Sequence, residues 1–397
     1  LAGYALSSAG LAKRILLFAA AGVSFAALLL TRSAGGFTAL ASGLTIFFLL
    51  VFKNKKRAAL YAFLAWAALL FTVFLLRPDI FSFPAAENSL SGRFSYWQDA
   101  LSEIFSSPYS ALLGFGPGAY SRIGSFGVKY PHNMYLQFAL EYGLAGLAAL
   151  VFLAFVITKE TFYTLKNSVK QGERAVIAGL FSGTAAFFVH GFIDIDSNYF
   201  QNTAVFAAVA GALAATWRRS CTVSFPPARV KNIMKKIKEN GLLAIIGTLL
   251  LVSCVFAKYH TANFTIVYAL VSAAVIYALF KNKEFLLASM LKPAAAWFYG
   301  LALLALCFTP NLHASIYELI RMLCAALLFF LGIAAFKNEK RLEVFLKMLN
   351  ALSAAVAAAG IIGYLFIGQE RSSAFFPNPN LLAGFLAVNI AFCLPNA

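Results

Sequence analysis

Long apolar runs recur along the whole chain, separated by short polar or basic stretches. A helix needs about 20 residues to cross the hydrocarbon of a bilayer, and it satisfies its own backbone hydrogen bonds where lipid offers no partner. By this measure we predict about twelve transmembrane helices. They lie near residues 15–31, 37–52, 58–76, 133–157, 175–192, 197–216, 241–257, 262–280, 293–309, 315–336, 346–367 and 380–397. The pattern predicts an all-α fold, a polytopic membrane helix bundle that forms one domain over residues 1–397.

Composition favours a membrane protein over a soluble one. Apolar residues make up 61% of the 397 positions and charged residues 12%, which leaves too little polar surface for water-soluble domains. A net charge of +17 would suggest nucleic-acid binding in a soluble protein, but here the basic residues lie in short clusters between apolar runs. We therefore expect membrane lipids and not nucleic acid as partners.

The basic clusters also predict an orientation. Alternating the connections between two sides places most of the 32 Lys and Arg residues on one side, which includes the basic loop 217–240. Because cytoplasmic loops are enriched in Lys and Arg, that side is predicted to be the cytoplasm, and the long loop 77–131 lies outside. Basic residues on the outer side run against this rule and are candidates for function: Arg32, Arg77, Arg93, Arg122, Lys129, Lys258, Arg321 and Arg371.

The long outer loop contains an amphipathic segment and a glycine-rich turn. On a helix over 91–105, five apolar residues share one face, which predicts a helix lying on the membrane surface: Phe94, Trp97, Leu101, Ile104 and Phe105. The turn Gly114-Phe-Gly116-Pro-Gly118 follows. Its backbone N–H groups could bind an anion, although a flexible loop is the commoner meaning of such a sequence.

A polar stripe follows this loop into the next apolar run. Asn133, Gln137 and Glu141 are four residues apart, so they lie on one face of a helix that enters the bilayer. A carboxylate inside a span is costly unless it has a partner or a function. A lone His132 would usually be an interfacial histidine without a role, but beside the stripe, the arginines and the glycines it is a candidate for chemistry.

These motifs resemble a known family. The sequence His132-Asn133, nine residues, and then Gly143-Leu-Ala-Gly146 is similar to the H-N-x9-G-x-x-G signature of the O-antigen ligase and polymerase superfamily. The segment 31–36 (TRSAGG) resembles the arginine motif of that family, and the segment 376–384 (FPNPNLLAG) resembles its N-P-N-L-L-A-G segment. The N-P-N segment comes first in the family and last here. We therefore expect a circularly permuted order, or two abutted halves, with 217–240 as the natural terminus or junction and 397 continuing into 1; an ordinary internal loop is the alternative.

The resemblance implies a glycosyltransferase of lipopolysaccharide and cell-envelope biosynthesis in the bacterial inner membrane, with its site facing the periplasm. A glycan would pass from undecaprenyl diphosphate to a sugar hydroxyl, on lipid A-core for a ligase or on the growing chain for a polymerase, with inversion and without a metal or other cofactor. The expected catalytic residues are His132, a base, and Arg32 and Arg93, which can hold a diphosphate. The expected substrate-binding residues are Asn133, Gln137, Glu141, Arg122, Lys129, Arg371, Asn378 and Asn380.

Two other functions fit parts of the sequence. A metal-dependent oligosaccharyltransferase would use the D-x-D of Asp194 and Asp196, although His190 and Asp194 could instead form a supporting pair on one helix face. A lipid-linked glycan flippase or other transporter would suit the number of spans. The outer position of the unusual charges and the lack of a visible internal repeat favour the transferase.

Overall fold

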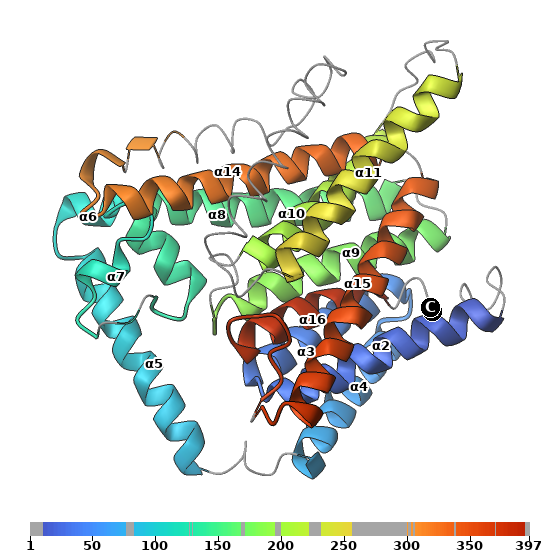
Figure 1. Ribbon diagram of the computed structural model, residues 1–397, viewed down its shortest axis with the longest axis horizontal. Coiled ribbons are helices and arrows are strands. Elements are labelled where there is room, and N and C mark those ends of the chain that lie inside the picture. Colours follow the sequence, from blue (N-terminus) through green and yellow to red (C-terminus); the bar gives the residue numbers. More distant parts are fainter. Residues whose placement is uncertain are drawn as a thin grey trace.

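The structure, a computed structural model, describes residues 11–76, 83–126, 128, 130–167, 171–194, 200–221, 232–255, 300, 303–304, 306–336, 339–369 and 371–393. Every regular element in this part of the chain is a helix, as predicted (Figure 1). The elements are α2 (Leu11–Thr31), α3 (Ala34–Val51), α4 (Lys55–Leu76), α5 (Phe83–Ile104), α6 (Pro108–Leu113), α7 (Tyr120–Ile123), α8 (Met134–Asn167), α9 (Gln171–His190), α10 (Phe200–Cys221), α11 (Asn232–Val255), η3 (Leu306–Phe308), α14 (Leu312–Ala335), α15 (Glu339–Phe366) and α16 (Pro379–Cys393).

Four of the described helices are long and apolar enough to cross a membrane: Ala34–Val51, Met134–Lys166, Leu312–Ile333 and Lys340–Phe366. Shorter apolar helices cover Phe18–Thr31, Asn202–Trp217, Leu243–Cys254 and Pro379–Ile390. The expected span at 262–280 lies outside the described residues, and so does most of that at 293–309. The count of about twelve spans stays a prediction.

The helices pack through a continuous apolar core in which small residues allow close approach. Helix α3 packs against α9 and α16, α2 packs against α15 and α16, and α10 packs against α14. Where α10 meets α14, a Cβ atom added to Gly332 would lie 3.2 Å from the Cα of Gly211, so the two backbones are in close contact. Such contacts between small residues are typical of helices that associate in lipid, where van der Waals packing drives association.

Hydrogen bonds join neighbouring helix ends at both ends of the bundle. At one end Arg174 donates from Nε to the carbonyl of Leu50 and from Nη1 to the carbonyl of Leu165, both at 3.1 Å, which joins the end of α3, the end of α8 and the start of α9. At the other end the N–H of Met134 donates to the carbonyl of Gly191 at 2.7 Å. The start of α8 therefore lies beside the end of α9.

Helix α5 diverges from the bundle along most of its length (Figure 1). It replaces the middle of the expected loop 77–131. Phe94 and Leu101 are exposed on it, and Phe105 is exposed just after its end; a position on the membrane surface stays a prediction. Ile104 differs from the prediction, because it is buried in a small second core with Tyr120 and residues of α8. The contact of α5 with α8 is the reason, since it covers one edge of the apolar face.

Candidate functional site

His132 lies in a tight turn immediately before α8. Its backbone is in the left-handed region, with φ 52°. Asn133 then caps α8, because its Oδ1 accepts from the N–H groups of Tyr135 at 3.0 Å and Leu136 at 3.1 Å. The H-N pair therefore forms the entrance to α8, with the histidine ring outside the helix.

The start of α8 is attached to the turn that follows α9. Asn133 Nδ2 donates to the carbonyl of Phe192 at 3.1 Å, and the Tyr135 hydroxyl donates to the carbonyl of Phe188 at 2.8 Å. The rings of Tyr135 and Phe192 also lie 4.2 Å apart. Asn133, expected to bind substrate, thus uses both ends of its amide to fix the position of His132.

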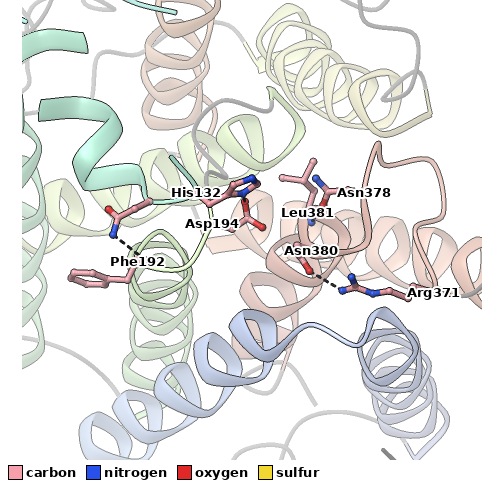
Figure 2. A network of polar contacts seen from close by, with 8 residues as sticks. His132, Phe192, Asp194, Arg371, Asn378, Asn380 and Leu381 are labelled. Carbon is pink, nitrogen blue, oxygen red and sulfur yellow. Dashed lines mark hydrogen bonds and ion pairs between the residues drawn. The ribbon is translucent and has the colours of Figure 1, made fainter. Parts of the chain in front are cut away.

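The turn after α9 supplies an acidic partner for His132. Asp194 Oδ1 lies 3.2 Å from His132 Nδ1 (Figure 2). The carboxylate side chain is 4% exposed and the imidazole 35% exposed, so the pair has a buried side and an accessible side. With Nδ1 occupied by the carboxylate, a neutral ring carries its proton there and leaves Nε2 as the basic nitrogen. No hydrogen bond engages Nε2 within the described part of the chain.

This pairing was not predicted from the sequence. We expected Asp194 either to act with Asp196 on a metal or to pair with His190 on its own helix. The structure adds a hydrogen bond from the N–H of Asp194 to the carbonyl of His190, at 3.0 Å, and directs the carboxylate to His132. Asp196 lies outside the described residues. Among those described, no three His, Cys, Asp or Glu side chains gather as they would around a metal ion.

Arg32 occupies the turn between α2 and α3. Its backbone is also left-handed, with φ 56°, and Ser33 caps α3 by accepting from the N–H of Gly36 at 3.2 Å. The half-buried guanidinium reaches the hydroxyl of Tyr364 at 3.5 Å, a long contact. The cap and the turn fix the backbone at Arg32 and therefore set the direction of its side chain.

The N-P-N segment lies against this turn. Arg371 donates from Nε to the carbonyl of Thr31 at 2.8 Å, and from Nη2 to the carbonyl of Arg32 at 3.3 Å and to Asn380 Oδ1 at 2.9 Å. Asn378 caps α16 by accepting from the N–H of Leu381 at 3.0 Å. Arg371 and Asn380, both expected to bind substrate, are thus connected to the arginine turn, and Figure 2 shows them in the same segment as Asn378.

The arginine turn and the His132–Asp194 pair lie at the same end of the bundle. A side chain on Gly35 would begin 3.3 Å from His190 Nε2 and 3.2 Å from Ile193, so the start of α3 is in contact with the end of α9. Helix α16 packs against both α3 and α9. The three motifs that are separated along the sequence therefore converge, and Figure 2 shows His132, Asp194 and Asn378 in one region.

Helix α5 approaches the same region from the other side. The ring of Tyr96 lies 6.1 Å from the ring of His132 and 5.3 Å from that of Phe126. Arg93 precedes Tyr96 by three residues and so lies on the same face of the helix. Within the described residues the half-buried Arg93 side chain makes no hydrogen bond or ion pair, which leaves its guanidinium available to a ligand.

A second set of contacts ties the loop after α7 to α5. The hydroxyl of Tyr120 donates to Asp99 Oδ2 at 2.9 Å, and the N–H of Ser125 donates to the same oxygen at 3.2 Å. Burial, and then the bond to Asp99, raise the pKa of Tyr120 above its ordinary value, so the phenol stays a proton donor. Arg122 is exposed on α7, and Lys129 lies outside the described residues.

The polar stripe leads away from His132 into the bundle. Gln137 donates to Glu141, and Glu141 Oε1 also accepts from the N–H of Gly118 at 2.8 Å. Nearby on α14, Glu318 pairs with the fully buried Arg321. Gln137 and Glu141 are therefore committed to the protein itself, and the structure does not bring them to the histidine.

The glycine-rich turn is hydrogen-bonded to α8 at the point where that helix is interrupted. The N–H groups of Phe115 and Gly116 donate to the carbonyls of Leu140 and Glu141, both at 2.9 Å. These carbonyls lose their helical partners because Gly143 leaves the helix, with φ 68°. Three of the turn's N–H groups, counting that of Gly118, are thus used within the protein, and the anion-binding interpretation finds no support in these contacts.

Comparison with known proteins finds a family that resembles part of the chain. A family model described as O-antigen ligase matches residues 19–151, which contain Arg32, Arg93 and His132 but not the N-P-N segment. No curated protein matches, and no solved structure matches. The described helices that are long and apolar enough to span a bilayer are consistent with a membrane protein of this kind. The match confirms, over residues 19–151, the resemblance that the sequence shows to the O-antigen ligase and polymerase superfamily; it covers less than half of the 397 residues.

Proposed function

We propose that this protein transfers a glycan from undecaprenyl diphosphate to a sugar hydroxyl, with inversion and without a metal ion. The acceptor is lipid A-core if the enzyme is a ligase, or the growing chain if it is a polymerase. The observation that carries the proposal is the His132–Asp194 pair, which lies at the same end of the bundle as the arginine turn. The family match is consistent with it.

His132 acts as the general base. Nε2 takes the proton of the acceptor hydroxyl while its oxygen attacks the anomeric carbon of the donor. Asp194 holds the ring through Nδ1 and stabilises the imidazolium that forms. The bond between the anomeric carbon and the diphosphate oxygen breaks on the opposite face, so the configuration inverts and undecaprenyl diphosphate leaves with its electron pair.

Arg32 and Arg93 hold the leaving diphosphate. A diphosphate gains negative charge as the glycosidic bond breaks, and guanidinium groups match its oxygens with two parallel hydrogen bonds. The Arg93 guanidinium has no hydrogen bond or ion pair to a described residue, and that of Arg32 has only the long contact to Tyr364. Arg122, Lys129 and the N-P-N asparagines remain candidate contacts to either substrate.

The site faces the periplasm in this proposal. The support is the charge distribution, since the basic loop 217–240 and the cluster at 53–57 lie on the predicted cytoplasmic side. Arg32 precedes α3 and the cluster at 53–57 follows it, so the two lie at opposite ends of that helix. Arg174 joins the end of α3 to the end of α8, and His132 lies at the opposite end of α8. Periplasmic transfer also suits a donor whose lipid anchor stays in the bilayer.

Substitutions test the role of His132 as a base separately from the role of the arginines in holding the diphosphate. In a transfer assay with purified protein, His132→Ala should reduce the rate by about 10²- to 10⁴-fold and leave donor binding nearly intact, because a base acts in the transition state. The exposed His313 is the matched control, and His313→Ala should transfer at the normal rate. A His132→Ala protein that turns over donor at the wild-type rate would remove the catalytic role.

Arg93→Ala should weaken donor binding as well as the rate. Losing one charge-assisted contact to phosphate costs about 1.5–3 kcal/mol, or roughly 10- to 150-fold in affinity. Arg93→Lys should recover only part of this, because an ammonium cannot reproduce the bidentate contact. Arg57→Ala, at an exposed position on the predicted cytoplasmic side, should leave donor affinity unchanged.

A further inference from the structure

Arg371 has its guanidinium turned toward the protein. The three hydrogen bonds described above occupy Nε and Nη2 and join the carbonyls of Thr31 and Arg32 to the side chain of Asn380. A guanidinium that contacted the diphosphate directly would have to give up some of these acceptors. We propose that Arg371 is a positioning residue that acts on the donor only through Arg32; this rests on the proposed role of Arg32.

The acceptors of Arg371 are the carbonyls that a helix end leaves open. Thr31 is the last residue of α2, and Arg32 follows it in the left-handed conformation. The last carbonyls of a helix have no intrahelical partner and carry partial negative charge, so a cation that donates to them stabilises the helix end. A left-handed non-glycine residue is strained and persists only where its surroundings hold it. Arg371 supplies that support from a segment 339 residues away.

The N-P-N segment in turn sets the position of Arg371. Asn378 caps α16, which fixes Asn380 in the first turn of that helix, and Asn380 Oδ1 accepts from Arg371. The N–H of Ser372 donates to the carbonyl of Leu30 at 2.9 Å and attaches the same segment to α2 a second time. Helix α16 therefore positions Arg371, and Arg371 positions the Arg32 backbone. Of these two arginines, Arg32 is the one whose side chain reaches the donor.

A double-mutant cycle tests this order. Binding of undecaprenyl diphosphate to purified protein would be measured for Arg32→Gln, Arg371→Gln and the double variant. We expect each single change to weaken binding by about 10-fold or more, and the double variant to bind no more weakly than Arg32→Gln alone, because Arg371 has nothing left to position. Losses that multiply in the double variant would show that Arg371 contacts the donor itself and would overturn the inference.

Two further variants separate positioning from charge. Arg371→Lys keeps the charge but cannot serve the three acceptors together, so positioning predicts weakened binding, whereas long-range attraction predicts wild-type binding. Asn380→Ala leaves the two carbonyl contacts in place and should weaken binding less than Arg371→Gln. If Arg371→Gln does not yield folded protein by thermal melting, the cycle is run with Arg371→Lys and has the same two outcomes.

Failure of the inference is distinct from failure of the proposed function. Wild-type donor binding by Arg32→Gln would remove the role of Arg32 in holding diphosphate, whatever Arg371 does. Weakened binding by Arg32→Gln together with unchanged binding by Arg371→Gln and Arg371→Lys would leave that role intact and overturn only the positioning proposal.

Discussion

Replacing Asp194 by asparagine gives the sharpest prediction about the histidine. The substitution keeps the size of the side chain and removes its charge, in a place where the carboxylate is nearly buried and 3.2 Å from His132 Nδ1. An asparagine amide can also turn its NH₂ group toward Nδ1, which would hold the proton on Nε2 and block the base. A hydrogen bond to a charged group contributes about 1.5–3 kcal/mol, so we expect transfer to slow by roughly 10- to 150-fold.

The assay is transfer from a lipid-linked glycan at saturating donor, with donor affinity measured in parallel. Asp194→Asn should lower the rate and leave donor affinity close to wild type, because the pair acts on the acceptor proton. Asp99→Asn is the matched control: it makes the same chemical change on α5, where Oδ1 of the new amide can still accept from Tyr120 or Ser125. Full activity of Asp194→Asn would refute the reasoning, and so would an equal loss in Asp99→Asn.

Other features give predictions of their own. Gly143→Ala should lower the apparent melting temperature, because the new side chain would collide with the Leu112 carbonyl at a position of positive φ; we expect a cost of about 2–4 kcal/mol. The control is Gly92→Ala, whose side chain would meet nothing within 4 Å. An equal loss in Gly92→Ala would argue against this role of Gly143. An impermeant thiol reagent should label Ser125→Cys and not Lys55→Cys in intact cells, in a background without native cysteines, and the reverse pattern would invert the orientation. Transfer should survive EDTA; activity that is lost and then restored by Mn²⁺ would favour the metal-dependent alternative.

The sequence predicted the fold class and the parts of the site that depend on local pattern. Apolar runs of helical length predict α3, α8, α14 and α15, because lipid leaves the backbone few other choices. The motifs around Arg32 and His132 fall in the segment that the family match covers. The spacing of Asn133, Gln137 and Glu141 places them on one helix face, but it does not say what that face touches.

The contacts that complete the site join distant segments, and local pattern could not predict them. Asp194 is 62 residues from His132, whereas its helical neighbour His190 is four residues away, so spacing pointed to His190 and could not reveal the contact with His132. Glu141 accepts from the N–H of Gly118, 23 residues earlier, beside the break of α8 at Gly143, and the spacing of the stripe predicts neither the contact nor the break. The expected continuation of residue 397 into residue 1 lies outside the described residues, because these exclude 1–10 and 394–397.

The hydrogen bond from Arg371 to the Arg32 carbonyl has a consequence for biosynthesis. The two residues are 339 positions apart, and ribosomes add about 5–20 residues per second, so roughly 20–70 s pass between their syntheses. During that interval the end of α2 lacks its donor, and α3 and α9 lack α16. Helices inserted early therefore wait in the bilayer as an incomplete assembly, open to chaperones and membrane proteases, until the last of these segments arrives.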